Sequence, residues 1–223
     1  MTIPVITIDG PGGAGKGTIS QAVATRLGWH YLDSGALYRI AGLAAARAPD
    51  IAPGELVSSL DLDIVIDDEG QVRYRLGGED VSEQIRTEEA GEAASRLAAL
   101  PEVRMALTGL QHRFRRAPGL VADGRDMGTV IFPDAGLKIY LTASAAERAR
   151  RRYKQLKDKG MGGSLAALFA DISRRDQRDA QRKVSPLRPA DDAVCIDTTG
   201  VAIDTVIGQV LSLAAQTFAS LKE

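Results

Sequence analysis

Ten residues near the N-terminus, D-G-P-G-G-A-G-K-G-T at positions 9–18, have a composition suited to holding phosphate. They follow an apolar run over 3–8, and Gly10, Gly15 and Lys16 have the spacing of a phosphate-binding loop. Glycines let backbone N–H groups turn toward phosphate oxygens, and the lysine can reach the β- and γ-phosphates. A glycine-rich turn alone is often only a turn, but this spacing after a strand predicts a nucleotide site. The residues expected to bind the nucleotide are Gly10, Pro11, Gly12, Gly13, Ala14, Gly15, Lys16, Gly17 and Thr18.

One position departs from the common form of this loop. Gly17 stands where a serine or threonine would offer its hydroxyl to Mg²⁺, and Thr18 comes one residue later. The metal should therefore be held differently from the metal of the switch-type phosphate-loop proteins. The form G-K-G-T resembles the nucleoside monophosphate kinases, in which phosphate passes between two nucleotides. Thr18 is then expected to contact the phosphates of the donor, and the phosphate is expected to reach another small molecule.

A second group of polar residues follows the short apolar segment 29–32. Asp33 and Ser34 come directly after it, and either could cap the helix that follows. Arg39 lies about one turn into that helix, from where its side chain can point back toward a phosphate. Ligands of open parallel sheets bind at the carboxyl ends of the strands, so we expect the acceptor here.

The third group closes the apolar segment 120–123. A carboxylate that ends a buried strand beside a phosphate loop commonly orients Mg²⁺ or its waters, which suits Asp123. Arg125 and Asp126 follow it in the loop. They could form a simple ion pair, but their place at the binding end of the sheet favours contact with a ligand.

Further along the chain, Arg175, Asp179 and Arg182 share one helix face by their i, i+4, i+7 spacing. A solvated ladder of ion pairs would explain the spacing equally well. Two considerations favour function, because residues 147–183 hold 12 basic and 5 acidic residues and phosphoryl transfer depends on arginines and Mg²⁺. Three arginines of the preceding helix could serve the same purpose, and the sequence does not distinguish among them. They are Arg148, Arg151 and Arg152.

Short β-branched segments alternate with longer helical patterns, which predicts an α/β fold with a doubly wound parallel sheet. Expected strands cover 4–9, 29–32, 120–123, 138–142 and 193–197. Expected helices cover 15–27, 34–48, 87–100 and 201–221, with another starting at Pro101. Two segments interrupt this alternation. Residues 62–66 and 72–76 flank D-D-E-G-Q and form an expected hairpin, and 145–159 and 164–183 form an expected helical hairpin with its tip at 160–163.

Composition narrows the classes of protein that fit. With 28 basic and 29 acidic residues, the chain does not have the charge of a general nucleic-acid binder. No apolar run reaches the ~20 residues of a membrane helix, and no basic region precedes the N-terminal run, so a soluble cytoplasmic protein is expected. The single Cys195 allows no internal disulfide and is expected in the core. His30 and His112 lack metal-ligand spacing and are expected to be structural.

Several of these segments together resemble the bacterial-type cytidylate kinases over nearly the whole chain. They are D-G-P-G-G-A-G-K-G-T, L-D-S-G-A-L-Y-R, E-D-V-S-E-Q-I-R-T, A-D-G-R-D-M-G-T-V and R-D-x-x-D-x-x-R. The resemblance implies a P-loop three-layer core with a five-stranded parallel sheet, a monophosphate-binding domain extended by an antiparallel insertion, and a helical lid. The tip at 161–164 is the main departure from the family pattern.

The resemblance also implies a reaction, in which ATP and CMP or dCMP give ADP and CDP or dCDP with Mg²⁺. Lys16, Arg125, Arg182 and Asp123 would be catalytic, with Asp123 holding the metal through water. The implied CMP-binding residues are Ser34, Arg39, Arg125 and Arg182 near the phosphate, Ser95, Arg104 and Asp126 at cytosine, and Arg175 and Asp179 at the ribose. The implied parts are a core of 1–32, 99–147 and 183–223, a monophosphate-binding domain of 33–98 with its insertion at about 58–98, and a lid of 148–182. A monomer is expected.

Two other functions share some of these features. A P-loop kinase of another small metabolite would use the same loop and sheet, but it would need a carboxylate placed as a base and no cytosine pocket. A non-catalytic ATP-dependent switch would want a serine or threonine at Gly17 and a residue that positions water.

Overall fold

The structure is a computed structural model that describes residues 2–66, 72–158, 160, 162–182 and 184–219. Its internal contacts group the chain into two compact units. Unit 1 consists of Met1–Asp33 and Arg113–Glu223, and unit 2 consists of Ser34–His112. The three-part division expected from the sequence remains a prediction.

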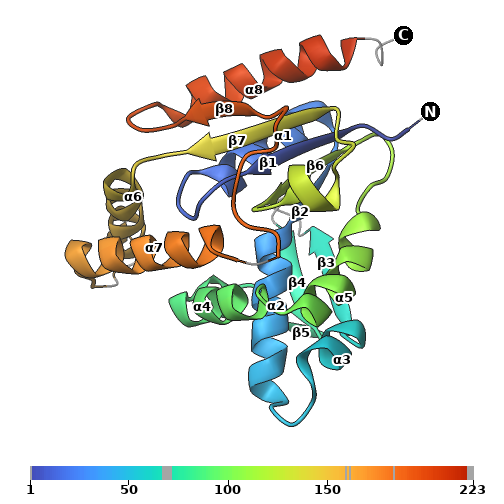
Figure 1. Ribbon diagram of the computed structural model, residues 1–223, viewed down its shortest axis with the longest axis vertical. Helices are drawn as coiled ribbons and strands as arrows, with labels where there is room; N and C mark the ends of the chain where they lie inside the picture. Colours follow the sequence, from blue (N-terminus) through green and yellow to red (C-terminus); the bar gives the residue numbers. More distant parts are fainter. Residues whose placement is uncertain (1, 67–71, 159, 161, 183, 220–223) are drawn as a thin grey trace. The chain divides into compact units, whose positions relative to one another are not determined.

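Unit 1 is built on a five-stranded sheet with the order β2-β6-β1-β7-β8, and every neighbouring pair in it is parallel (Figure 1). The strands are β1 (Val5–Asp9), β2 (His30–Asp33), β6 (Leu120–Gly124), β7 (Leu137–Thr142) and β8 (Val194–Asp197). This confirms the expected parallel sheet. All strands point the same way, so residues that end β1, β2, β6 and β7 meet at one edge, where ligands of such sheets bind.

Two helices bury the hydrophobic residues of β1 on one face of this sheet. Helix α1 (Lys16–Leu27) and helix α8 (Ile203–Thr217) contribute Val23 and Val210 to the same core cluster as Ile6 and Ile8. Because side chains alternate along a strand, Thr7 and Asp9 face the other side. Helix α8 is shorter than the expected 201–221, and the last part of that range lies outside the described residues.

The helical hairpin of unit 1 consists of α6 (Ala145–Asp158) and α7 (Leu165–Ala180). A small apolar cluster of Ala149, Leu156 and Leu168 joins the two helices, and the Ser164 hydroxyl caps α7 by accepting from the backbone N–H of Ala167. Both helices match the expected hairpin, while its expected ends at 159 and 183 and Met161 of its tip lie outside the described residues. We call α6 and α7 the helical hairpin below.

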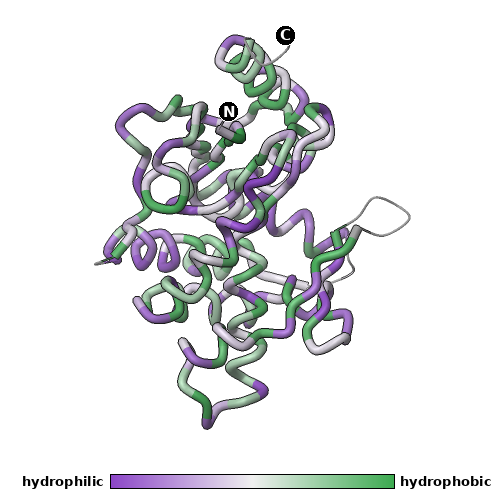
Figure 2. The backbone as a smooth tube through the Cα atoms, turned by 90° about the vertical axis from the view of Figure 1, so that its right-hand side faces the viewer, coloured by the Kyte–Doolittle hydropathy of each residue, from purple (hydrophilic) through white to green (hydrophobic). Residues whose placement is uncertain are grey.

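Unit 2 contains a small antiparallel sheet and five helices within the described residues. The strands β3 (Leu62–Ile66), β4 (Val72–Leu76) and β5 (Glu79–Asp80) are paired in that order, with Leu62 opposite Leu76. Strand β4 has hydrophobic residues at its two ends and hydrophilic ones between them (Figure 2), and Tyr74 at its centre packs into the local core. The hairpin strands are those predicted from the sequence, and the predicted turn at 67–71 lies outside the described residues. The helices are α2 (Ser34–Arg47), α3 (Pro53–Ser58), η1 (Gln84–Arg86), α4 (Glu88–Leu97) and α5 (Pro101–His112).

One expectation from the sequence is wrong, and one helix was not expected. Cys195 is exposed, although its apolar neighbours suggested a place in the core. The reason is that β8 is the edge strand and pairs only with β7, so along β8 Ile196 alone is buried. The short helix α3 was not expected from the sequence, since its 6 residues are too few to show a helical period.

Candidate functional site

The phosphate loop is held in shape by glycines that no other residue could replace without strain. Gly10, Gly13 and Gly15 have φ angles of 146°, 82° and 93°, in the region that favours glycine. At Gly10 an added Cβ would lie 2.1 Å from the carbonyl oxygen of Leu141 in β7, which no side chain can tolerate. The backbone of the loop therefore lies directly on the sheet, and Gly15 is the residue that immediately precedes α1.

Lys16 lies at the start of α1 and is buried, with 6% of its surface exposed. Its ammonium donates to the carbonyl of Pro11 at 3.1 Å and lies 3.8 Å from a carboxylate oxygen of Asp123, near the end of β6. Burial and the nearby charge of Arg125 lower the pKa of Lys16, and burial raises the pKa of Asp123. Both charged forms are held out of water, so a phosphate that enters here meets a cation that little solvent screens.

Arg125 lies between the phosphate loop and the helical hairpin. A terminal nitrogen of its guanidinium is 3.4 Å from the position of a Cβ on Gly12, and its Nε donates to Asp179 of α7 at 2.9 Å. Arg182 donates to the other oxygen of the Asp179 carboxylate. Burial would raise the pKa of Asp179, but the charges of Arg125 and Arg182 outweigh it and hold that pKa below its usual value. The structure thus brings together Arg125, Asp179 and Arg182, with Arg175 close enough to contribute to the same field.

Arg148, one of the three arginines that the sequence left undecided, is buried where α6 begins. Its guanidinium donates to the carbonyl of Gly12 at 3.0 Å and to the carbonyl of Ala143 at 2.9 Å, and it pairs with Asp176 of α7 through two nitrogens. Arg148 therefore ties the phosphate loop to both helices of the hairpin.

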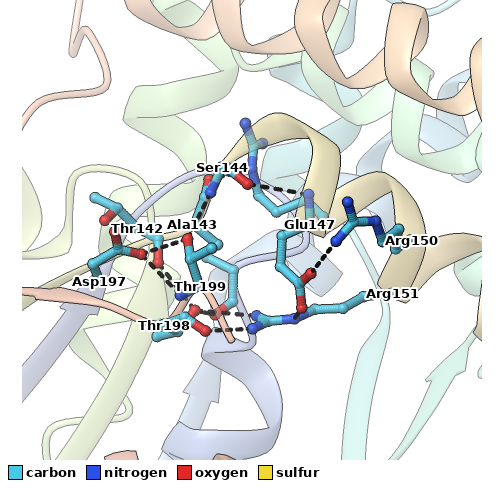
Figure 3. Close-up of polar contacts among 11 residues, drawn as sticks. Thr142, Ala143, Ser144, Glu147, Arg150, Arg151, Asp197, Thr198 and Thr199 are labelled. Carbon is cyan, nitrogen blue, oxygen red and sulfur yellow. Dashed lines mark hydrogen bonds and ion pairs between the residues drawn. The ribbon is translucent and has the colours of Figure 1, made fainter. Parts of the chain in front are cut away.

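Arg151 makes a second connection, one turn further along α6 (Figure 3). It donates to Glu147 at 3.1 Å, to the hydroxyl of Thr198 at 3.1 Å and to the carbonyl of Thr198 at 2.5 Å. The buried Thr198 hydroxyl in turn lies 3.2 Å from the carbonyl of Ala14 in the phosphate loop. The loop after β8 and the phosphate loop are thereby joined to α6. Asp197 fixes this turn by accepting from the backbone N–H and the hydroxyl of Thr199.

Three contributors to this arrangement were missed by sequence reasoning. They are Asp9, Asp176 and Thr198. Asp9, at the end of β1, accepts from the backbone N–H groups of Met127 and Gly128, each at 2.8 Å. The sequence signals for these residues were weak. Asp9 directly precedes Gly10, Asp176 lies in the R-D-x-x-D-x-x-R segment, and Thr198 follows a strand, but none of these positions specifies a partner.

Of the remaining predicted acceptor residues, all but Asp126 lie in unit 2. Ser34 is buried in the first turn of α2, and Ser95 is buried on α4. Arg39 donates to the carbonyls of Ile85 and Thr87, at 2.8 and 2.9 Å, just before α4 begins. Arg104 is buried on α5 and makes a long hydrogen bond of 3.4 Å to the carbonyl of Ala98. Asp126 belongs to unit 1, where it is buried directly after Arg125.

The donors available to a metal ion are few. Within the described residues no group of three or more histidine, cysteine or acidic side chains is arranged to hold one. The Asp123 carboxylate does face the phosphate loop, with one oxygen 3.5 Å from the position of a Cβ on Gly17. A single hard oxygen donor beside a phosphate loop fits Mg²⁺ bound mainly by water and phosphate.

His30 was predicted from the sequence to be structural. In the structure it contacts the carbonyl of Ala117 at 2.9 Å.

No helix in the described part of the chain is both long and apolar enough to cross a membrane.

Comparison with known proteins finds relatives that match over most of their length. The family model described as cytidylate kinase matches residues 6–216. A curated cytidylate kinase of Aeromonas hydrophila subsp. hydrophila is 55% identical over 218 residues, covering 96% of this chain and 94% of that protein. One from Nitrosococcus oceani is 56% identical over 216 residues, covering 94% and 95%. The crystal structure of an uncharacterized protein from Eubacterium ventriosum ATCC 27560 shares the fold, with a TM-score of 0.53, 11% identity, and coverage of 94% of this chain and 97% of that chain.

Proposed function

The chain belongs to the cytidylate kinase family, and we propose that it transfers the terminal phosphoryl group of ATP to CMP or dCMP, giving ADP and CDP or dCDP. The observation that carries the proposal is the meeting of Lys16 and Arg125 on the phosphate loop. Arg125 lies against Gly12 and lowers the pKa of Lys16, so two cations lie close together beside the phosphate loop. Two cations beside inward-turned backbone N–H groups attract an anion, and triphosphate is the anion that this loop is built to hold.

Phosphoryl transfer needs positioning and charge stabilisation more than covalent chemistry, because its transition state resembles metaphosphate. We assign Lys16, Arg125 and Arg182 to the charge that develops on the transferred group and on the bridging oxygen. Mg²⁺, when bound, would neutralise part of the phosphate charge, and Asp123 would hold it through water. The nine residues from Gly10 to Thr18 surround the phosphates of ATP, mainly with backbone N–H groups.

The acceptor is assigned to the residues that match the family's motifs. Ser34, Arg39, Arg125 and Arg182 would bind its phosphate, and Arg175 and Asp179 its ribose. Ser95, Arg104 and Asp126 would contact cytosine. These assignments are supported by the match of each residue to a family motif.

Base selectivity follows from the donors and acceptors of cytosine. Its N4 amino group donates and its N3 and O2 accept, so Asp126 can accept from N4 while Arg104 donates to the other edge. Uracil would place O4 against the carboxylate and an N3–H donor against the guanidinium. Each good base-edge contact is worth about 1–3 kcal/mol of discrimination. We therefore expect a strong preference for CMP and dCMP over UMP.

The same proposal includes the organisation of the protein. The core of 1–32, 99–147 and 183–223, the monophosphate-binding domain of 33–98 and the lid of 148–182 are proposed as its functional parts. We further propose a cytoplasmic monomer that acts on nucleotides and engages neither nucleic acid nor membrane. The near balance of 28 basic and 29 acidic residues supports this.

A panel of acceptors at fixed Mg·ATP tests the reaction. ADP release should be fast with CMP and dCMP, and slow with UMP, AMP, shikimate and gluconate. Faster release with an alcohol substrate would identify a kinase of another small metabolite. Slow hydrolysis that no acceptor changes would identify a switch.

The Asp126→Ala variant tests how the base is recognised. It should lower kcat/KM for CMP by about 10- to 100-fold and change kcat/KM for UMP much less, since each base contact is worth about 1–3 kcal/mol. Asp191→Ala is the matched control, because Asp191 is exposed and lies outside the site. Equal losses with both acceptors in Asp126→Ala would show that the residue supports the loop and does not recognise the base.

A further inference from the structure

The loop after β6 leads into a short π-helix, η2 (Met127–Ile131), whose first two N–H groups are bound by a residue from another strand. Asp9 ends β1, and its two carboxylate oxygens accept separately from Met127 and Gly128, at 2.8 Å each. The partners are 118 and 119 residues apart in the chain. Hydrogen bonds from two backbone donors to one charged group are among the stronger ones in proteins and fix both donors in place.

The residue in position to cap this helix does not do so. Asp126 immediately precedes η2, and an aspartate there ordinarily accepts from the first free N–H groups. Here no side-chain hydrogen bond of Asp126 caps the helix. Asp9 satisfies these donors instead, so the carboxylate of Asp126 is not used for capping.

A second observation shows how closely the loop is held to β1. An added Cβ on Gly128 would lie 2.8 Å from the hydroxyl oxygen of Thr7 and 3.2 Å from the side chain of Lys138. Thr7 lies two residues before Asp9 and so shares its face of the strand. The backbone of Gly128 therefore rests directly on the strand, at the point where Asp9 binds it.

From these contacts we infer that Asp9 is a positioning residue for acceptor recognition, which fixes the segment 125–128 and so orients Arg125 and Asp126 toward the monophosphate nucleotide. This inference rests on the proposed function, because it assigns Arg125 and Asp126 to CMP. Asp9 itself touches neither substrate in this role. It acts through the backbone of the two residues that follow Asp126.

Asp9 is a buried carboxylate that interacts with several other charged side chains. It is 5% exposed, and burial raises the pKa of its carboxyl to about 6, with the two N–H bonds opposing this. The charge of Asp126 also raises that pKa and Lys16 lowers it, and Asp9 in turn acts on Asp123 and on Tyr140 of β7. A residue whose only purpose was stability would not need a buried charge beside other carboxylates.

The test compares Asp9→Asn with Thr7→Val. Asparagine has one acceptor oxygen, so one of the two N–H groups faces an amide donor and the segment 125–128 loses part of its anchor. A small misplacement of binding groups commonly costs about 10- to 100-fold, so kcat/KM for CMP should fall by that amount in Asp9→Asn. The KM for ATP should stay within about threefold of wild type. Thr7→Val changes the same face of the same strand without removing a hydrogen bond, because the Thr7 hydroxyl has no hydrogen-bond partner among the described residues, and it should leave both constants unchanged.

The result that overturns the inference is equally specific. Asp9→Asn kinetics equal to those of Thr7→Val would do so, as would equal losses for CMP and ATP, which indicate a general structural role. Should wild type itself fail to phosphorylate CMP, the proposed function fails, and that outcome is distinct from either of these.

If Asp9→Asn yields no folded protein, Gly128→Ala replaces it. The added methyl pushes the same N–H group away from Asp9, because it meets the Thr7 hydroxyl. We expect a similar loss of kcat/KM for CMP, and partial rescue when Thr7→Ala removes the obstructing atom. A Gly128→Ala enzyme with wild-type CMP kinetics, or a loss that Thr7→Ala does not reduce at all, would contradict the inference.

Discussion

The phosphate loop and the helical hairpin both position charge for the same reaction, but they are held by different means. In the loop the backbone sets the shape, because Gly10, Gly13 and Gly15 take positive φ angles and Lys16 donates to the loop's own Pro11. In the hairpin the arginines are held by side chains, as Arg148 is by Asp176. Other residues cannot adopt these glycine conformations without strain. An arginine paired with a carboxylate, by contrast, can leave it for a phosphate.

This difference predicts what each region tolerates. The loop is preformed for its ligand, so a change there removes binding geometry that nothing else can supply. Arg148 is paired with Asp176 and Arg125 with Asp179, both aspartates of the hairpin, and each arginine can exchange its partner for phosphate oxygens of similar geometry. We therefore expect changes in the loop to act mainly on catalysis, and loss of the Arg148–Asp176 pair to act mainly on stability.

The largest effect should come from Lys16→Met. Methionine keeps the length of the buried side chain and removes the charge that follows the transferred phosphoryl group. Loss of one preorganised donor to a transition state commonly costs about 100- to 1,000-fold in kcat, and a full charge should cost at least that. Steady-state turnover with CMP and Mg·ATP measures it, with thermal unfolding as the check on folding. Activity within tenfold of wild type would show that the loop is not where phosphate is transferred.

The second prediction concerns the ionisation of Asp9, which ends β1 directly before Gly10 of the phosphate loop. Burial raises its pKa to about 6 from an ordinary 3.8. As pH rises from 4 to 6 the unfolded chain loses this proton first, so the free energy of unfolding falls across that window and stays lower above it. A pKa difference of this size is worth about 3 kcal/mol.

Urea denaturation at pH 4.5 and 7.5 measures this effect in wild type, Asp9→Asn and Thr7→Val. The decrease with pH should be smaller in Asp9→Asn by about 2–3 kcal/mol. Thr7→Val carries no titratable change and should follow wild type. If the free energy of unfolding changed with pH equally in wild type and Asp9→Asn, ionisation of Asp9 would cost the folded protein nothing.

What the sequence could predict follows the same division. The glycine spacing, the strands of the sheet and both strands of the β3–β4 hairpin were predictable, because each depends on local pattern. The contacts of Asp9 with Gly128 and of Thr198 with Ala14 were not, since they join residues more than 100 positions apart. Cys195 was wrongly placed in the core because an apolar segment does not reveal that its strand is an edge.

The π-helix η2 is a further case. Its sequence M-G-T-V-I has no helical period, and three of its five residues are β-branched, which favours a strand. The helix forms because Asp9 binds its first N–H groups and because Gly128 can lie against β1. Only the assembled sheet provides both conditions.

The smallest effect should come from the ion pair of the helical hairpin, and two pairs on α7 allow a matched comparison. Asp176 pairs with Arg148, whose side chain is 5% exposed, whereas Asp171 pairs with Arg174, whose side chain is 65% exposed. Asp176→Ala leaves a buried guanidinium without its carboxylate and should lower the free energy of unfolding by about 1–3 kcal/mol. Asp171→Ala removes a solvated pair and should cost about 0.5 kcal/mol or less.

Because Arg148 also donates to Gly12 and Ala143, it should stay in place in Asp176→Ala, and kcat should fall less than in Lys16→Met. The double variant Arg148→Met with Asp176→Ala should cost less than the sum of the single changes, because the buried charge leaves with its partner. Equal costs for Asp171→Ala and Asp176→Ala would show that the hairpin does not depend on its buried pair, and a kcat loss as large as that of Lys16→Met would show that the hairpin, like the loop, is fixed for catalysis.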